Sequence, residues 1–197
     1  RWNAVAIDTA EGAKVEQVRV ELGGSVSACG TRALLPASHT EYDLDAIYFG
    51  EGSSVLDFND VSVHTGKDTL CEMHTAGVLT GHADKTLRGT IDFRRGAKRG
   101  VGHESEDVLL FSPNARNRTT PLILCGEEEV EGQHAASIGR LDEEKLYYLR
   151  SRGLTEAQAR RLMVEARFAP AIEKIPLDAL REEVRAGAAR RLDHAAE

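Results

Sequence analysis

Aromatic residues are scarce in this chain, since phenylalanine, tryptophan and tyrosine together make up 5% of its 197 residues. Hydrophobic residues as a whole make up 41%, which is enough for a folded core and argues against a disordered chain. With so few rings, that core must consist mainly of valine, leucine, isoleucine and alanine, which favours flat, repetitive packing. No apolar run approaches the roughly 20 residues that a membrane helix needs, so we expect no membrane partner.

Cysteine is also rare, and the three residues, Cys29, Cys71 and Cys125, lie far apart in the sequence. An odd number without a C-x-x-C motif argues against a disulfide framework and against a zinc knuckle. Free thiols are typical of a reducing compartment, so we expect a cytoplasmic protein. The chain opens without a signal peptide, and Val5 and Ile7 already resemble the middle of a strand. We therefore expect the carboxy-terminal portion of a longer protein.

Catalytic motifs are missing as well. The sequence contains no G-x-S-x-G, no H-E-x-x-H, no Walker loop and no dinucleotide-binding fingerprint. The formal net charge of −7 argues against nonspecific binding to nucleic acid or to an anionic membrane surface. We therefore expect a protein that is not an enzyme and that has no nucleic-acid partner.

Residues 1–137 show an alternation of apolar and polar side chains with a period close to two, interrupted by glycine-containing corners. Such alternation is typical of half-buried strands. It predicts an all-β domain, and the pattern alone leaves a sandwich and a solenoid equally open. The apolar positions expected to share a face are Val18, Val20 and Leu22; Tyr42, Leu44, Ala46 and Tyr48; Val55, Val61 and Val63; and Leu87, Gly89, Ile91 and Phe93.

From residue 138 the period changes to 3.6, which predicts a helical domain over residues 138–197. Asp142 is a good N-cap for a first helix that ends at Gly153. Thr155 and Gln158 form a capping box for a second helix. We expect Pro170 to kink or end that helix and Pro176 to begin a third one. The expected apolar faces are Ala159, Leu162, Met163, Ala166 and Ala169 on the second helix, and Leu177, Leu180, Val184, Ala188 and Leu192 on the third.

The two regions differ in charge. Residues 1–137 hold 13 basic and 21 acidic side chains, net −8, whereas residues 138–197 hold 12 and 11, net +1. The helices are short, amphipathic and balanced in charge, which is more typical of a docking element than of a catalytic domain. We expect Leu146, Tyr147, Leu149 and Leu162 to share a small core of their own, with an apolar strip left for a partner.

Two groups of residues could carry chemistry in the strand region. Asp57, Asp60, His64 and Asp68 could form an acidic stripe that binds Ca²⁺, although solvated residues on the outward faces of strands explain them more simply. Cys125 follows the apolar run "PLILC" and precedes three glutamates, which would raise the pKa of its thiol. We therefore expect Cys125 to be a small core residue rather than a ligand.

His134 is the histidine with an unusual setting. Its neighbours have minimal side chains, so another backbone or subunit can approach closely, and its imidazole is available to a metal. The other histidines are expected to be ordinary hydrogen-bonded residues. The small neighbours are Gly132, Ala135, Ala136, Ser137 and Gly139, and the other histidines are His39, His64, His74, His82, His103 and His194.

One long segment resembles the SufB/SufD family of iron–sulfur cluster assembly proteins. The segment reads "LLFSPNARNRTTPLILCGEEEVEGQHAASIGRLDEEKLYYLRSRGLTEAQARRLM", and its block around His134 and "YLRSRG" is the specific part. Upstream, "ALLPASHTEYDLDAIYFGEG", "DVSVHTGKDT" and "GVLTGHADKTLRGTIDFRRGAK" resemble the strand region of the family in order and spacing. The resemblance spans nearly the whole chain.

The resemblance implies a right-handed parallel β-helix followed by a small α-helical domain, which favours the solenoid over the sandwich. It also implies a non-catalytic subunit that pairs with a SufB-like scaffold through the β-helix. A SufC-like ATPase would dock on residues 138–197. The chain alone would bind no cofactor tightly and would form a homodimer, and an iron–sulfur cluster would be held only transiently, in the complex.

The sequence departs from SufB-like members at two positions. Ala135 stands where they carry a glutamate after the histidine, and Glu106 stands where they carry a cysteine before a "D-x-L-L" stretch. The chain therefore resembles SufD-like members more than SufB-like ones, and the resemblance implies that His134 is its candidate metal ligand at the cluster site. Two alternatives remain open: a β-helix carbohydrate-active enzyme, and a purely structural partner in which His134 serves packing alone.

Overall fold

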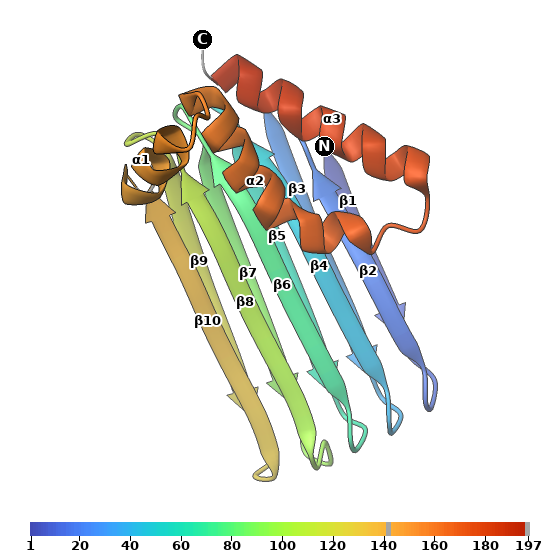
Figure 1. Ribbon diagram of the computed structural model, residues 1–197. Coiled ribbons are helices and arrows are strands. Elements are labelled where there is room, and N and C mark those ends of the chain that lie inside the picture. The colour runs from blue at the N-terminus through green and yellow to red at the C-terminus, as the bar shows by residue number, and fades with distance from the viewer. Residues whose placement is uncertain (141–142, 196–197) are drawn as a thin grey trace.

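In the described part of the chain, ten parallel strands form a solenoid, and three helices follow it (Figure 1). The computed structural model describes residues 1–140 and 143–195. The chain alternates between two five-stranded sheets, ordered β1-β3-β5-β7-β9 and β10-β8-β6-β4-β2, so each turn adds one strand to each sheet. The strands are β1 (Trp2–Asp8), β2 (Lys14–Glu21), β3 (Val26–Leu35), β4 (Glu41–Gly50), β5 (Val55–His64), β6 (Leu70–Leu79), β7 (Asp84–Phe93), β8 (Gly100–Leu110), β9 (Arg116–Cys125) and β10 (Val130–Arg140).

The parallel pairing settles the choice between sandwich and solenoid in favour of the solenoid. Tyr42 on β4 lies beside Cys71 on β6, which lies beside Gly102 on β8, so equivalent positions stack turn upon turn. Two of the predicted faces are confirmed. Their members Tyr42, Leu44, Ala46 and Tyr48 on β4, and Leu87, Ile91 and Phe93 on β7, are buried.

The predicted face of β5 is wrong at two of its three apolar positions. Val63 is buried as expected, but Val55 is exposed and Val61 is half-buried, whereas Leu56, Phe58 and Asp60 are buried. Period-two alternation does not by itself say which of the two sets points inward. Here the set with the larger apolar side chains, Leu56 and Phe58, occupies the interior. Asp60 lies on the same face of the strand and is therefore buried as well.

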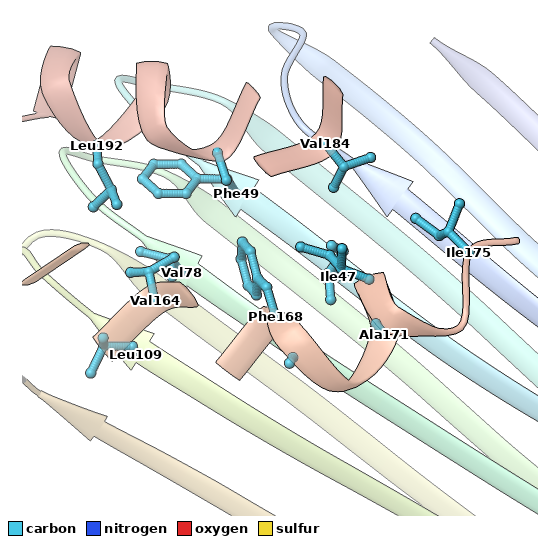
Figure 2. Packing of buried hydrophobic residues seen from close by; sticks show 13 residues of the cluster. Ile47, Phe49, Val78, Leu109, Val164, Phe168, Ala171, Ile175, Val184 and Leu192 are labelled. Atoms are coloured by element: carbon cyan, nitrogen blue, oxygen red, sulfur yellow. The ribbon is translucent and has the colours of Figure 1, made fainter. Parts of the chain in front are cut away.

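The three helices are α1 (Glu143–Ser151), α2 (Glu156–Glu173) and α3 (Asp178–Ala195). Helices α2 and α3 lie across the outer face of the sheet β10-β8-β6-β4-β2, near the carboxyl ends of its strands (Figure 1). Figure 2 shows Ile47, Phe49 and Val78 from the sheet packed against Phe168 and Val164 of α2, in one buried cluster. The helical region therefore shares its main core with the solenoid.

Ion pairs add to this contact between the helices and the sheet. Arg167 of α2 pairs with Asp107 of β8 at 3.1 Å between Nε and Oδ2. Lys174, just after α2, pairs with Asp45 of β4, and Arg191 of α3 pairs with Glu51. Three basic residues of the helical region thus pair with carboxylates of the solenoid.

The predicted helix ends are largely confirmed. Gly153 follows α1 with a φ of 95°, and Thr155 and Gln158 form the expected capping box of α2. Pro170 does not end α2, which continues to Glu173. Pro176 precedes α3, which begins at Asp178 rather than at the proline itself. The N-cap expected at Asp142 lies outside the described residues.

The predicted apolar faces of the helices are only partly right. Leu162 is 45% exposed, and Tyr147 is 76% exposed, so the separate small core that was expected around them does not form. Val164 and Phe168 are buried instead, because the sheet offers α2 an apolar surface that the helical sequence alone does not reveal. Strand β10 also runs to Arg140, three residues past the expected boundary at 137.

None of the helices in the described part of the chain combines the length and apolar character that crossing a membrane requires.

Candidate functional site

His134 lies on β10, which is the edge strand of its sheet. The strand pairs in parallel with β8, and the register places His134 beside Glu104. Because side chains that pair across parallel strands project to the same face, His134 points toward Glu104 and the solenoid interior. The last turn, β9 and β10, thus forms an open end, which we call the mouth of the solenoid.

The mouth is partly open to solvent because no described strand pairs with the outer edges of β9 and β10. Ile123 and Val130 pack against the interior core, whereas Gly132 and Ala136, on either side of His134, are exposed. These small residues leave the imidazole accessible from outside. The expected setting of His134, a ring among minimal side chains at the end of the strand region, is what the structure contains.

The His134 ring and the Glu104 carboxylate are close but not hydrogen-bonded. Nδ1 of His134 lies 3.5 Å from Oε2 of Glu104, and the two side chains are 21% and 4% exposed. Neither atom has a hydrogen-bond partner among the described residues. Burial, then the nearby carboxylates of Glu106 and Asp60, raise the pKa of Glu104 to about 7, while Lys85 acts in the opposite direction.

A second polar cluster surrounds Glu106 on β8, and its side chains form hydrogen bonds and an ion pair with one another. Glu106 pairs with Lys85, whose side chain is completely buried. Lys85 Nζ also donates to Asn117 Oδ1 at 2.8 Å and to Thr119 Oγ1 at 3.2 Å, and Thr119 donates to Glu106. Burial lowers the pKa of Lys85, and Glu106 opposes that shift. This cluster stabilises the interior and leaves no open ligand position.

The interior nearer the first turn also holds charged groups. Arg19 of β2 binds Asp60 of β5 through two hydrogen bonds of 2.6 and 2.7 Å. Cys29 donates to Glu21 at 3.1 Å, and burial, followed by Glu21, raises the pKa of the Cys29 thiol to about 11. Cys29 is therefore a poor thiolate ligand.

The acidic stripe considered for Ca²⁺ does not exist. Asp60 and His64 point into the solenoid, whereas Asp57 pairs with Arg88 and Asp68 pairs with Arg99 on the outside. Since the four side chains lie on different faces, they form no common site.

Cys125 is exposed, so the expectation that it is a core residue is wrong. In the register of β7 and β9 it lies beside Phe93, which is completely buried. Cys125 thus lies on the side of β9 that faces the interior. Because β9 belongs to the last turn that the structure describes, no further turn covers this side chain. A cysteine at the end of an apolar run is buried only if another strand stacks on it.

Several of the other histidines have ordinary partners. His64 is buried and contacts Thr69 Oγ1 through Nδ1 at 2.8 Å, and burial lowers its pKa to about 4. His74 contacts Ser105, and His103 contacts Glu72, on the outer face of the sheet. Within residues 1–140 and 143–195, no three His, Cys, Asp or Glu side chains are arranged to hold a metal by themselves. His134 could therefore serve only as one donor of a shared site.

Sequence reasoning missed Glu104 as the neighbour of His134. The stretch "GVGHESED" alternates with period two, but polar residues on strands were expected to face outward. The available signal was the pairing register: a strand whose buried positions include Glu104 and Glu106 lies directly beside the strand of His134.

Comparison with known proteins gives a consistent result. The family described as SUF system FeS cluster assembly, SufBD core domain, matches residues 1–167. The chain is 30% identical over 142 residues to the iron-sulfur cluster assembly protein SufD of Bacillus subtilis (strain 168), covering 72% of this chain and 32% of that protein.

Two further relatives are iron-sulfur cluster assembly SufBD family proteins. The one from Pyrococcus horikoshii is 42% identical over 159 residues, covering 81% of this chain and 35% of the relative. The one from Mycobacterium bovis is 30% identical over 182 residues, covering 88% and 46%. The chain thus spans 32% to 46% of the length of these curated relatives. With the family match over most of its residues, the chain belongs to the SufB/SufD family.

Proposed function

We propose that this chain is a SufD-like subunit of an iron–sulfur cluster assembly complex and that His134 donates one ligand to the nascent cluster. The observation that carries the proposal is the position of His134 at the open mouth of the solenoid, next to a buried carboxylate. Family membership and the SufD relative support the assembly role. The cluster is the cargo of such a complex, not a resident cofactor of this chain.

The donor set of the mouth fits a shared site. An imidazole nitrogen is a suitable ligand for iron, and thiolates usually complete an iron–sulfur site. Cys29 and Cys71 are buried, and Glu106 occupies the position where SufB-like members carry a cysteine. Cys125 is exposed at the end of β9 and is the one thiol of this chain that a partner could reach. A SufB-like partner would therefore have to supply most of the thiolates, and this chain would contribute the histidine.

The edge of the last turn supports pairing with such a partner. Strands β9 and β10 expose one row of backbone groups each, and edge strands of this kind pair readily with another chain. Leu122, Leu124 and Ile138 on these strands are large apolar residues that remain exposed. Without the SufB-like partner, a second copy of this chain would occupy the same edge as a homodimer.

Docking of a SufC-like ATPase is assigned to the exposed apolar residues of α1 and α2. Tyr147 and Tyr148 of α1 and Leu162 of α2 are large apolar residues that remain exposed, whereas Val164 and Phe168 of α2 pack on the sheet. Deleting residues 138–197 is a poor test, because it would uncover the apolar outer face of the sheet. Changes of single surface residues avoid that problem.

The docking test compares a double variant on α1 and α2 with a single variant that serves as the control. A Tyr147→Ser, Leu162→Ser chain should lose capture of a SufC-like ATPase in a pull-down. Leu177→Ser, which changes an exposed apolar residue just before α3, should keep it. Unchanged capture by the double variant would show that the ATPase docks on another surface of the chain.

The cluster role is tested on the complex with the SufB-like and SufC-like partners from the same organism. Wild type, His134→Ala and His82→Ala are purified, and complex mass, melting temperature, bound iron and acid-labile sulfide are measured on the same samples. His82 is exposed and lies in a turn, so it is a suitable control. We expect iron and sulfide to fall only in the His134→Ala complex, with mass and melting temperature unchanged.

The outcome also separates the remaining alternatives. If iron falls only in proportion to lost complex, His134 serves packing or pairing and not the cluster. Normal iron in an intact His134→Ala complex would exclude the ligand role. The carbohydrate-active enzyme has no support now that the chain belongs to the SufB/SufD family.

A further inference from the structure

Glu104 is a buried carboxylate that the proposed ligand role of His134 does not explain. Its side chain is 4% exposed, and its Oε2 atom has no hydrogen-bond partner in the described part of the chain. A buried carboxylate oxygen without a donor is costly, because its lost hydration is not replaced. An unpaired group of this kind at a candidate site calls for a functional reason.

The interior is shaped around this side chain. Gly89 on β7, in the opposite sheet, faces Glu104, and a β-carbon at that position would overlap the Glu104 carboxyl group. The glycine therefore leaves the space that the carboxylate occupies. From the other direction, the register of β8 and β10 fixes Glu104 directly beside His134.

Lys85 is a cation whose charge acts on Glu104, but its donors are used elsewhere. An ammonium group has three N–H donors. Those of Lys85 go to Glu106, Asn117 and Thr119. The donor within reach of Glu104 Oε2 is therefore His134 Nδ1, at 3.5 Å, which lacks a partner of its own.

We propose that Glu104 is a positioning residue that accepts a hydrogen bond from Nδ1–H of His134 and so turns Nε2 toward the mouth as the iron-binding nitrogen. The inference rests on the proposed function, because it presumes that His134 serves the cluster. A neutral imidazole carries one N–H and one free nitrogen. A carboxylate that accepts from one nitrogen fixes which of the two is free, and metal-binding histidines are commonly held in this way.

The gap that must close to form the bond is small. The separation of 3.5 Å exceeds a normal N–H···O distance by only about half an ångström. Gly132 and Ala136 flank His134 on its own face of β10, so no large side chain on that strand blocks the movement. Closing this gap would satisfy both unpartnered atoms at once.

The test uses two variants that remove the interaction in different ways. Glu104→Met replaces the carboxylate with an uncharged side chain of similar size, and Gly89→Ala keeps the carboxylate but displaces it. Glu131→Met, an exposed carboxylate on the same strand as His134, is the matched control. Removing a buried unpaired carboxylate should not impair folding, and Gly89→Ala provides an independent result if it does.

The primary measurement is the tautomer of His134, read from its ring ¹⁵N shifts in the metal-free complex at a pH where the imidazole is neutral. We expect the Nδ1–H form in wild type and in Glu131→Met, and a shift toward the Nε2–H form in both Glu104→Met and Gly89→Ala. The second measurement is retention of iron against a chelator. We expect about tenfold weaker retention in the two interior variants, as is typical for a lost carboxylate partner of a histidine ligand.

The results separate this inference from the function on which it rests. If His134→Ala leaves bound iron unchanged, the proposed function is wrong, while the tautomer shift still decides the role of Glu104. If His134→Ala abolishes iron binding but the interior variants keep the Nδ1–H form and full retention, Glu104 does not position the ring. A wild-type ring in the Nε2–H form would overturn the inference directly.

Discussion

His64 allows a sharp prediction about pH and stability. The ring ends β5, is completely buried, contacts Thr69 Oγ1 through Nδ1 at 2.8 Å and packs on Phe93 with 4.6 Å between ring centroids. Burial lowers its pKa to about 4, and the Asp92 carboxylate only partly opposes this. Replacing it with an uncharged residue, as in His64→Gln, should therefore change how stability depends on pH.

The sign follows from proton binding in the two states. Below its usual pKa of 6.5, the ring takes up a proton in the unfolded chain but stays neutral in the folded one until about pH 4. The unfolded state then binds more protons, so stability falls as the pH falls through this window and is unaffected above it. At 1.36 kcal/mol per pKa unit, the full effect is about 3 kcal/mol. By about pH 5, roughly 2 kcal/mol of it should be lost.

Urea unfolding of wild type and His64→Gln across this pH range measures the effect. The wild type should lose about 2 kcal/mol more than the variant between about pH 8 and pH 5, because other titrating groups act equally in both chains. An NMR titration of the His64 ring in the folded chain should show it neutral at about pH 5. Parallel stability curves, or a ring that titrates near 6.5, would refute the reasoning.

Three further experiments test the interior charges, the packing of α2 and the exposure of the cysteines. Lys85→Met should destabilise the chain by about 3–5 kcal/mol in urea unfolding, since it leaves Glu106 buried without its partner, and adding Glu106→Leu should recover most of the loss. Phe168→Ala should cost about 3–5 kcal/mol, whereas Leu162→Ala should cost under about 1 kcal/mol; equal costs would mean that α2 does not pack as described. Cys125 should react with maleimide in the native chain while the two buried cysteines stay unlabelled, as measured by mass spectrometry of the labelled peptides. A protected Cys125, or labelling of the other two cysteines, would contradict the described burial.

The strands were predictable because they repeat a local pattern. Tyr42 and Leu44 on β4, and Ile91 and Phe93 on β7, alternate with polar residues and are all buried. The capping box of Thr155 and Gln158 was equally visible, since it involves only residues close in sequence. The choice between sandwich and solenoid was not local and needed the family resemblance.

The faces of the helices were not predictable from the helices alone. Leu162 and Val164 have similar apolar character, yet the first is exposed and the second is buried. The difference arises from Phe49 and Val78, which are distant in sequence and present an apolar outer surface of the sheet to α2. A helix that packs on a sheet turns toward the available surface, which its own period does not specify.

The candidate site was half predictable. His134 stood out because its neighbours are small, but Glu104 did not, since polar residues on strands were expected to face solvent. In this solenoid the interior also holds ion pairs such as Arg19 with Asp60. Finding such residues requires the register between strands, which depends on contacts between turns that are far apart in sequence.

The central claim is that His134 is a ligand of the cluster, and its most direct test is pulsed EPR of the complex with a reduced cluster. Only this chain is labelled with ¹⁵N-histidine, so a nitrogen coupling from an imidazole bound to iron identifies its source. The account predicts that this coupling is present in wild type, unchanged in His82→Ala and absent in an intact His134→Ala complex. A wild-type cluster without the coupling, or the same coupling in His134→Ala, would contradict it.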